Sequence, residues 1–204
     1  AYVIKTLQWD LDSYLAFDYY GNRAFGYRYV ANYPMLFRIA TTYLRITGDR
    51  AFLNQQLGHK TVLEQLDRLA LHYRDYLMAD RGLADFGGDP WHFLECVPTY
   101  IHATAGFNAA YVTMLREMAD LYEFQGNKPL AEQRRAAAEK LIAAIYPQLY
   151  VPGKGFWQSR YPDGRQFDMR HCLDFQFVAQ GIGQDLPALV RREMRDFVVN
   201  ELLM

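Results

Sequence analysis

The sequence predicts a mainly α-helical fold built from antiparallel helix hairpins, and three observations favour it. Apolar residues recur at spacings of three and four along most of the chain, which is the period of an amphipathic helix. Two of these stretches close on a glycine followed by Asp49 or Asn127, which are residue types that cap the next helix. No linker rich in Gly, Pro or Ser divides the chain. Residues 1–204 are therefore expected to form a single domain.

Seven stretches carry the helical period. The stretch that starts at Pro34 is expected to bury a wide apolar face, because proline is well tolerated in the first turn of a helix; the face comprises Leu36, Ile39, Ala40, Tyr43, Leu44 and Ile46. We expect helices over residues 6–20, 34–47, 57–78, 99–125, 130–146, 173–182 and 187–204.

One segment has the period of a β-strand instead. Between residues 153 and 169, two sets of side chains alternate ahead of the turn residues Pro162, Asp163 and Gly164. The two sets are Phe156, Gln158 and Arg160 on one face and Trp157, Ser159 and Tyr161 on the other. This pattern predicts one short β-hairpin.

Composition excludes several classes of protein. Lys and Arg number 22 against 23 Asp and Glu, so the net charge of -1 gives no field that attracts phosphate backbones or anionic lipids. No stretch reaches the ~18 apolar residues that a membrane helix needs. Neither nucleic acid nor a membrane is an expected partner. Self-association is expected if Phe197, Val198, Leu202 and Leu203 form an uncovered apolar patch.

The cysteines and histidines predict no metal or redox centre. Cys96 and Cys172 are too few for a disulfide framework and are expected to be buried thiols. His92 and His102 have no third ligand at helical spacing, so no metal is expected. Because phosphate-binding and dinucleotide-binding glycine motifs are also missing from the sequence, no cofactor is expected.

The aromatic content leaves two interpretations open. The chain has 16 Tyr, 13 Phe and 3 Trp. Tyrosine offers an apolar face with a polar tip, which suits a wet concave site that stacks on flat ligands. A tyrosine-rich helical core explains the same count equally well.

The loop between residues 81 and 98 concentrates polar and aromatic side chains among glycines, namely Asp85, Asp89, Trp91, His92 and Glu95. Hydrolysis of a glycosidic bond needs one carboxyl that donates a proton and another that is ionised. Aromatic neighbours desolvate a carboxyl, and Asp85 precedes Phe86, so Asp85 is the leading candidate. The simpler interpretation is that Asp85 or Asp89 caps a turn.

A second histidine and carboxylate pair begins the helix near residue 172. His171 and Asp174 either cap that helix or contact a sugar, and capping is favoured because such residues are common at helix starts.

Several stretches together resemble the catalytic domain of the six-hairpin toroid glycosidases. They are GYRYVANYPMLFRIATTYLRITGDRAFL, GLADFGG, FLECVPTYIHATAGFNAAYVTMLREMADLYEFQGN, GKGFWQSRYPDGRQF and HCLDFQFVAQGIG. The sequence looks closest to bacterial members related to glycoside hydrolase family 63 and, more distantly, to trehalases and α-L-rhamnosidases. The resemblance implies a partial (α/α)6 toroid.

The resemblance also implies roles for particular residues. Asp85 matches the general acid of that superfamily, with Phe86 where relatives commonly have Trp. Trp91, His92 and Tyr19 would border the sugar. Trp157 is a weaker candidate and is as readily explained as core. The sequence of residues 87–92 differs from the one usual in that superfamily, so Asp89 and Glu95 are alternatives to Asp85 as the general acid.

A full toroid of twelve helices needs roughly 350 residues or more, so this chain is expected to be an incomplete one. The resemblance places the catalytic base in a later helix pair. The function expected is hydrolysis of an α-linked glycoside with inversion. A sugar epimerase on the same toroid, with histidines as acid and base, and a non-catalytic helical scaffold are the alternatives.

Overall fold

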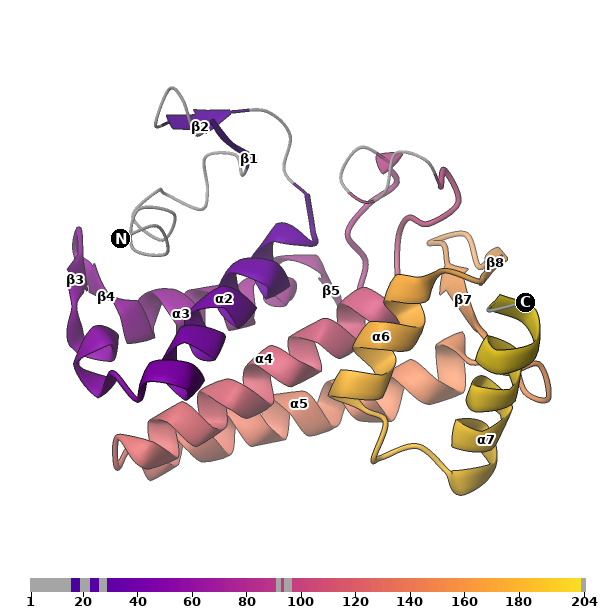
Figure 1. Cartoon of the computed structure of the whole chain (residues 1–204). Coiled ribbons are helices and arrows are strands. Elements are labelled where there is room, and N and C mark those ends of the chain that lie inside the picture. The colour runs from indigo at the N-terminus through magenta and orange to yellow at the C-terminus, as the bar shows by residue number, and fades with distance from the viewer. Residues whose placement is uncertain (1–15, 19–22, 26–28, 91–92, 94–96, 203–204) are drawn as a thin grey trace.

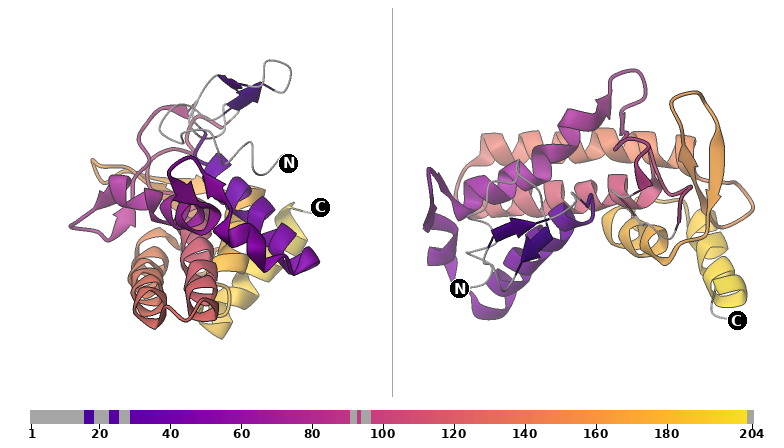
Figure 2. Two further views of the ribbon diagram at one scale, coloured as in Figure 1. Left: turned by 90° about the vertical axis from the view of Figure 1, so that its left-hand side faces the viewer. Right: turned by 90° about the horizontal axis from the view of Figure 1, so that it is seen from above.

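The structure is a computed structural model, and it describes residues 16–18, 23–25, 29–90, 93 and 97–202. Six α-helices lie in this part of the chain, and α4 contacts α2, α3, α5 and α6 (Figure 1). The helices are α2 (Asn32–Thr47), α3 (Val62–Leu71), α4 (Ala105–Phe124), α5 (Lys128–Leu149), α6 (Cys172–Gly181) and α7 (Ala188–Phe197). The view along the molecule in Figure 2 shows α4 and α5 side by side. The mainly α class predicted from the sequence is confirmed.

Short elements connect the helices. Two 3-10 helices (Arg50–Asn54 and His72–Tyr76) follow α2 and α3, and a π-helical turn (Val198–Leu202) follows α7. Four two-stranded antiparallel sheets pair β1 (Ala16–Asp18) with β2 (Arg23–Phe25), β3 (Gln56–Leu57) with β4 (Lys60–Thr61), β5 (Leu77–Met78) with β6 (Leu83–Ala84), and β7 (Trp157–Arg160) with β8 (Gln166–Met169). The expectation of one hairpin was therefore wrong, because three further pairs are too short to leave an alternating pattern.

The helix turns follow the predicted chemistry. Gly48 ends α2 with a φ of 64°, and the side chain of Asp49 accepts from the Phe52 N–H. Gly126 follows α4 with a φ of 78°, and Asn127 caps α5 by accepting from the Leu130 N–H. Left-handed backbone of this kind favours glycine, so each helix stops where the sequence predicts.

Several predicted helices begin or end elsewhere; α5 ends at Leu149 rather than at residue 146, and α7 ends at Phe197 rather than at residue 204. Residues 16–18 of the expected first helix are strand β1, because they pair with residues 23–25; the rest of that stretch lies outside the described residues. The expected helix over 57–78 is shortened to α3, since Thr61 and Glu64 form a capping box that starts it at Val62. The helix expected from residue 99 starts only at Ala105.

The buried face of α2 differs from the one predicted. Tyr33, Pro34 and Phe37 are buried, together with Ala40 and Thr41, whereas Ile39, Tyr43 and Ile46 are exposed. Leu36 and Leu44 of the predicted face do pack against the core. The helix begins two residues before Pro34, and Tyr33 stacks on His72 with ring centroids 3.7 Å apart.

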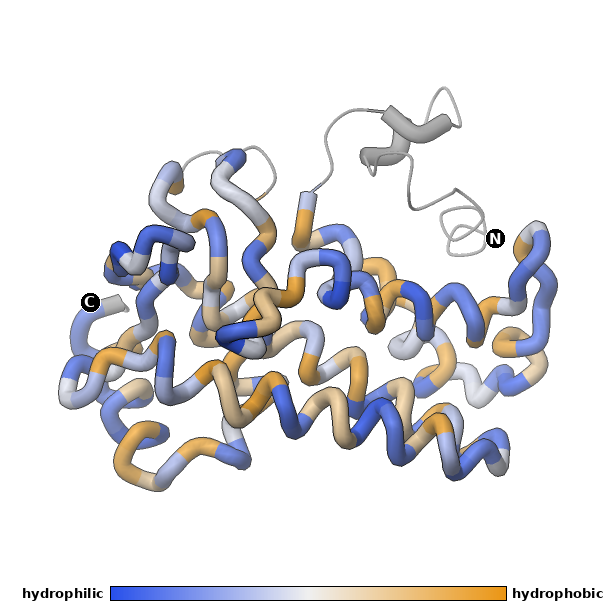
Figure 3. The backbone as a smooth tube through the Cα atoms, turned by 180° about the vertical axis from the view of Figure 1, so that it is seen from behind, coloured by the Kyte–Doolittle hydropathy of each residue, from blue (hydrophilic) through white to orange (hydrophobic). Residues whose placement is uncertain are grey.

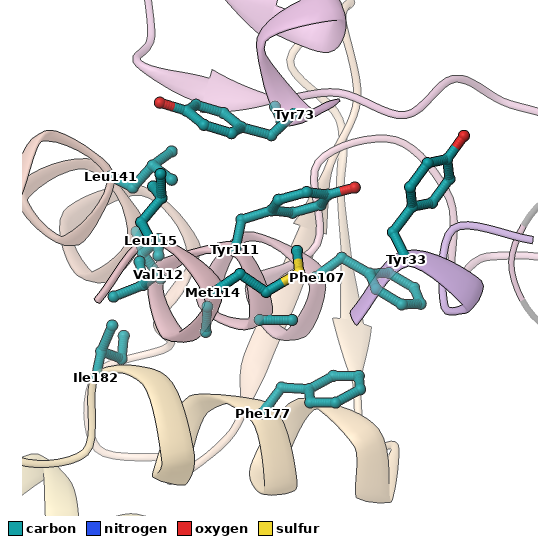
Figure 4. Packing of buried hydrophobic residues seen from close by; sticks show 14 of the residues in the cluster. Tyr33, Tyr73, Phe107, Tyr111, Val112, Met114, Leu115, Leu141, Phe177 and Ile182 are labelled. Carbon is teal, nitrogen blue, oxygen red and sulfur yellow. The ribbon is translucent and has the colours of Figure 1, made fainter. Parts of the chain in front are cut away.

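The core gathers around α4, which is buried along most of its length. Phe107, Tyr111 and Leu115 of α4 lie between Tyr73 on one side and Phe177 of α6 on the other (Figure 4). Helices α4 and α6 approach closely, since a Cβ on Gly181 would lie 2.2 Å from the carbonyl oxygen of Ala109. Figure 3 shows hydrophobic and hydrophilic residues alternating along the long helices, as the predicted period requires.

The hairpin β7–β8 is confirmed, and it packs on the core. Trp157 and Ser159 are buried, whereas Gln158 and Arg160 are half-buried. Trp157 is fully enclosed, with its ring centroid 5.1 Å from that of Tyr150, so it is a core residue and contacts no open site.

Of the apolar patch expected near the end of the chain, the structure describes the side chains of Phe197 and Val198, and both are half-buried. Phe197 is half-buried, with ring centroids 5.3 Å from Phe156 and 5.6 Å from Phe175, and Val198 packs against the same core. Leu203 and the side chain of Leu202 lie outside the described residues. Within the described part of the chain, no helix is long and apolar enough to span a membrane.

Candidate active site

The loop that carries Asp85 is held at the N-terminal end of α4 by one buried amide. The side chain of Asn108 accepts from the Ala84 N–H at 2.8 Å and donates to the carbonyl oxygens of Ala84 at 3.1 Å and Thr104 at 2.9 Å. Asn108 is fully buried. Because a buried amide with three partners has little freedom, it fixes the backbone just before Asp85. Sequence reasoning missed Asn108, although an Asn within the apolar run AGFNAAYV is a signal.

The two carboxylate oxygens of Asp85 have different surroundings. Oδ1 accepts from the Gly87 N–H at 2.9 Å and lies 3.0 Å from His102 Nδ1. Oδ2 is buried and has no hydrogen-bond partner among the residues that the structure describes. The side chain is 10% exposed, so the unpartnered oxygen is a polar group that the fold leaves unsatisfied. The hydrogen bond from Gly87 is the turn-capping role that the sequence analysis favoured for Asp85. The same oxygen also contacts His102.

His102 has an unusual backbone. Its φ is 64°, and it is the one non-glycine residue with a positive φ in the part of the chain that the structure describes. Such a conformation costs of order 1 kcal/mol or more unless the surroundings hold it. The His102 N–H donates to the Gly87 carbonyl at 2.8 Å, and its ring centroid lies 4.5 Å from that of Tyr161. Sequence analysis considered His102 only as a metal ligand, and it lacks the partners for that role.

Aromatic rings form the surface beneath Asp85. Phe86 is buried and stacks on Tyr111, with centroids 5.7 Å apart and an interplanar angle of 18°. Its edge contacts are Phe93 and Phe107. The predicted apolar setting next to Asp85 is therefore present, with Phe86 as a core ring.

A second buried carboxyl, Asp174, lies in the first turn of α6. Its Oδ1 accepts from the Tyr100 hydroxyl at 2.9 Å and from the Gly106 N–H at 2.5 Å, and its Oδ2 is buried without a partner. Burial raises the pKa of Asp174 to about 7, against the opposing effect of those two donors. The same burial, together with Asp174, raises the pKa of Tyr100 well above its usual value.

His171 caps α6, as the sequence favoured. Its Nδ1 accepts from the Leu173 N–H at 3.2 Å, and burial lowers the pKa of this imidazole below its ordinary value. A neutral ring is the form that accepts this hydrogen bond.

Cys172, the first residue of α6, is exposed, so the prediction of a buried thiol at that position was wrong. Cys96 lies outside the described residues.

The segment from Tyr100 to Gly106 connects the two carboxyls. Tyr100 and Gly106 bind Asp174, and His102 between them binds Asp85. Ala103 pairs with Arg160 of β7, which joins the segment to the β7–β8 hairpin. In Figures 1 and 2 this loop rises beside that hairpin at the N-terminal end of α4.

The structure brings only part of the predicted site together. Asp89 is half-buried in the same loop as Asp85. Trp91, His92, Glu95 and Tyr19 lie outside the described residues. Within the described part of the chain, no group of three His, Cys, Asp or Glu side chains is placed to hold a metal ion.

Surface grooves elsewhere have a different lining. One of about 460 Å³ lies between α2 and α4, bordered by Leu44, Arg45, Asp120 and Phe124. Asp85 does not line it. Asp174 does not line it either.

The fold places the chain in the mainly α class, with α4 in contact with α2, α3, α5 and α6. No family model matches the chain, and no curated protein matches it.

Two solved structures make the likeness specific. The chain is similar to a rhamnosidase from Klebsiella oxytoca with rhamnose bound, with a TM-score of 0.68 and 17% identity over 88% of this chain and 32% of that one. It is also similar to a glycoside hydrolase family 78 rhamnosidase of Bacillus sp. GL1, with a TM-score of 0.68 and 20% identity over 85% of this chain and 17% of that one.

At these identities the likeness is one of fold, and the chain spans a third or less of each enzyme. The sequence analysis treated rhamnosidases as the more distant relatives. The closer relation to glycoside hydrolase family 63 finds no support in these structures.

Proposed function

We propose that this chain is part of the catalytic domain of a glycoside hydrolase that cleaves an α-linked glycoside with inversion, and that Asp85 is the general acid. The main support is that the two carboxylate oxygens of Asp85 have different surroundings. Its Oδ1 is occupied by Gly87 and His102, and its buried Oδ2 has no partner in the described part of the chain. A carboxyl held by one oxygen presents the other oxygen, with its proton, to a leaving group.

The substrate class that we propose is an α-L-rhamnoside. Support comes from the fold shared with two rhamnosidases, one of them described with rhamnose bound. Five further residues are proposed as sugar contacts because they lie with Asp85 in one loop or match the resemblance: Trp91, His92, Asp89, Glu95 and Tyr19.

The catalytic base is proposed to come from a later helix pair of the complete toroid. Asp174 is the other buried carboxyl described, and its Oδ1 is held by the Tyr100 hydroxyl and the Gly106 N–H. Its two donors make it a support for the loop between Tyr100 and Gly106. Glu95 is the alternative base within this sequence.

The two rival functions have less support. An epimerase needs two histidines free to exchange protons, yet His171 caps a helix and His72 Nδ1 lies 3.1 Å from the Tyr111 hydroxyl. A scaffold does not explain the left-handed backbone of His102 beside Asp85, since strain of this kind clusters at functional sites.

The test is a screen of aryl α-glycosides and disaccharides with the protein of the whole gene. We expect release of the aryl group from an α-L-rhamnoside, and proton NMR of the first product is expected to show the β-anomer. Release of the α-anomer first would contradict inversion, and inactivity on every glycoside would contradict the proposal.

A further inference from the structure

His102 is the residue whose contacts call for an explanation beyond packing. It adopts a left-handed backbone that L-residues rarely adopt, and its main chain, ring and Nδ1 all contact the loop or hairpin around Asp85. Strain of this kind persists only where several contacts hold it, and it clusters at functional sites. A loop residue without such contacts would adopt a negative φ. The contacts of His102 therefore hold its backbone in the left-handed conformation.

The contacts define which nitrogen faces the carboxyl. Gly87 N–H already points at Asp85 Oδ1, so this oxygen acts as an acceptor. A histidine nitrogen at 3.0 Å from the same oxygen then donates to it, which places the proton on Nδ1. The opposite edge of the ring lies against Gly88, where a Cβ would be 2.9 Å from Nε2. Gly88 therefore leaves the room that this ring position requires.

The backbone adds a second connection between the same two segments. The His102 N–H donates to the Gly87 carbonyl, and the Gly87 N–H donates to Asp85. On the other side, the ring packs against Tyr161, which follows β7. The imidazole is thus held between the hairpin and the loop, with Nδ1 directed at one oxygen of Asp85.

We infer that His102 is a positioning residue, which holds Oδ1 of Asp85 and thereby fixes the direction of Oδ2. The inference rests on the proposed function of Asp85 and assigns to His102 the orientation of that carboxyl. His102 does not contact the substrate in this account. Its role is to restrict the carboxyl to one orientation, which is worth most where a proton is transferred over a short distance.

Two variants of His102 test the role through activity. His102→Gly adopts a positive φ without strain but has no donor. We expect it to lower kcat 10- to 100-fold, with KM within twofold of the parent. His102→Asn also tolerates a positive φ and carries an amide that reaches a similar position, so we expect it to recover at least tenfold of that loss. Equal kcat for the two variants would overturn the inference.

Gly88→Ala is the matched variant that leaves His102 unchanged. The new methyl group would meet Nε2, so we expect the ring to move and kcat to fall as in His102→Gly. Asp80→Asn, at a side chain that is 75% exposed, is its control and should retain parental kcat. Parental kcat in Gly88→Ala would contradict the positioning role.

Nitrogen-15 NMR of the histidine rings gives a readout that needs no activity. At a pH where the ring is neutral, we expect His102 to carry its proton on Nδ1 in the parent and to shift towards the Nε2–H tautomer in Asp85→Ala. A proton on Nε2 in the parent would refute the inference. The Nδ1 tautomer in a protein whose Asp85 variants keep full activity would instead refute the proposed function, and the two failures are thereby distinguished.

Discussion

The hydroxyl of Tyr100 donates to Oδ1 of Asp174 at 2.9 Å, in a position where both side chains are fully buried. Since Gly106 N–H donates to the same oxygen, a proton on the carboxyl belongs on Oδ2. This contact joins the loop before α4 to the first turn of α6.

The buried carboxyl predicts a pH dependence of stability. The pKa of Asp174 is raised from 3.8 to about 7 in the folded protein, so the folded state holds the proton more tightly than the unfolded state. The contribution of Asp174 to the free energy of unfolding is fully present below pH ~4 and is lost as pH rises towards 7. A difference of about three in pKa corresponds to roughly 4 kcal/mol. We expect the free energy of unfolding of the parent to fall over this range relative to Asp174→Asn, measured by urea denaturation.

Asp80→Asn is the control for that series, since the Asp80 side chain is 75% exposed. Its free energy of unfolding should follow that of the parent at each pH. A parent curve parallel to that of Asp174→Asn between pH 4 and 7 would show that the carboxyl is ionised in the folded state.

Asn108→Ala is expected to destabilise the protein by about 2 to 4 kcal/mol. The substitution removes three hydrogen bonds of the Asn108 amide, to the Ala84 N–H and to the carbonyl oxygens of Ala84 and Thr104, and unmade buried hydrogen bonds cost about 1 kcal/mol or more each. Thr113→Ala on the same helix is the control, because its hydroxyl makes one contact of 3.4 Å. Urea denaturation of both decides the matter, and equal effects would contradict the account of the Asp85 loop.

The exposed stripe on α2 predicts self-association of the 204-residue chain. Ile39 is 42% and Ile46 is 79% exposed, and Met35 and Tyr43 lie on the same side of the helix. We expect the apparent mass in sedimentation to rise with concentration, and Ile39→Lys/Ile46→Lys to abolish the rise. Leu77→Lys, which changes an exposed leucine on β5, should still associate. A parent that stays monomeric would contradict the prediction.

Much of the fold was predictable because its signals are local. Gly48 with Asp49, and Gly126 with Asn127, define helix ends within a few residues. The turn after β7 likewise determines the hairpin that contains Trp157. Helix starts were less predictable, because Ala105 begins α4 only after the preceding loop has paired with β7.

The candidate site was predictable only in part. Asp85 could be selected as a carboxyl beside an aromatic residue in a glycine-rich loop. Its pairing with His102 could not, because the two residues are 17 positions apart and meet only where the loop returns under a left-handed turn. Asp174 was expected near a helix start, whereas its contact with Tyr100 depends on the packing of α6 against α4.

The central claim is that Asp85 is the general acid, and hydrolysis by Asp85→Asn in the protein of the whole gene tests it most directly. With a disaccharide, whose leaving oxygen needs a proton, we expect turnover to fall ~100-fold or more, with a smaller loss on an activated aryl glycoside. Asp89→Asn serves as the control and should lose much less. Parental turnover of the disaccharide by a folded Asp85→Asn variant would contradict the account and transfer the role to Asp89 or Glu95.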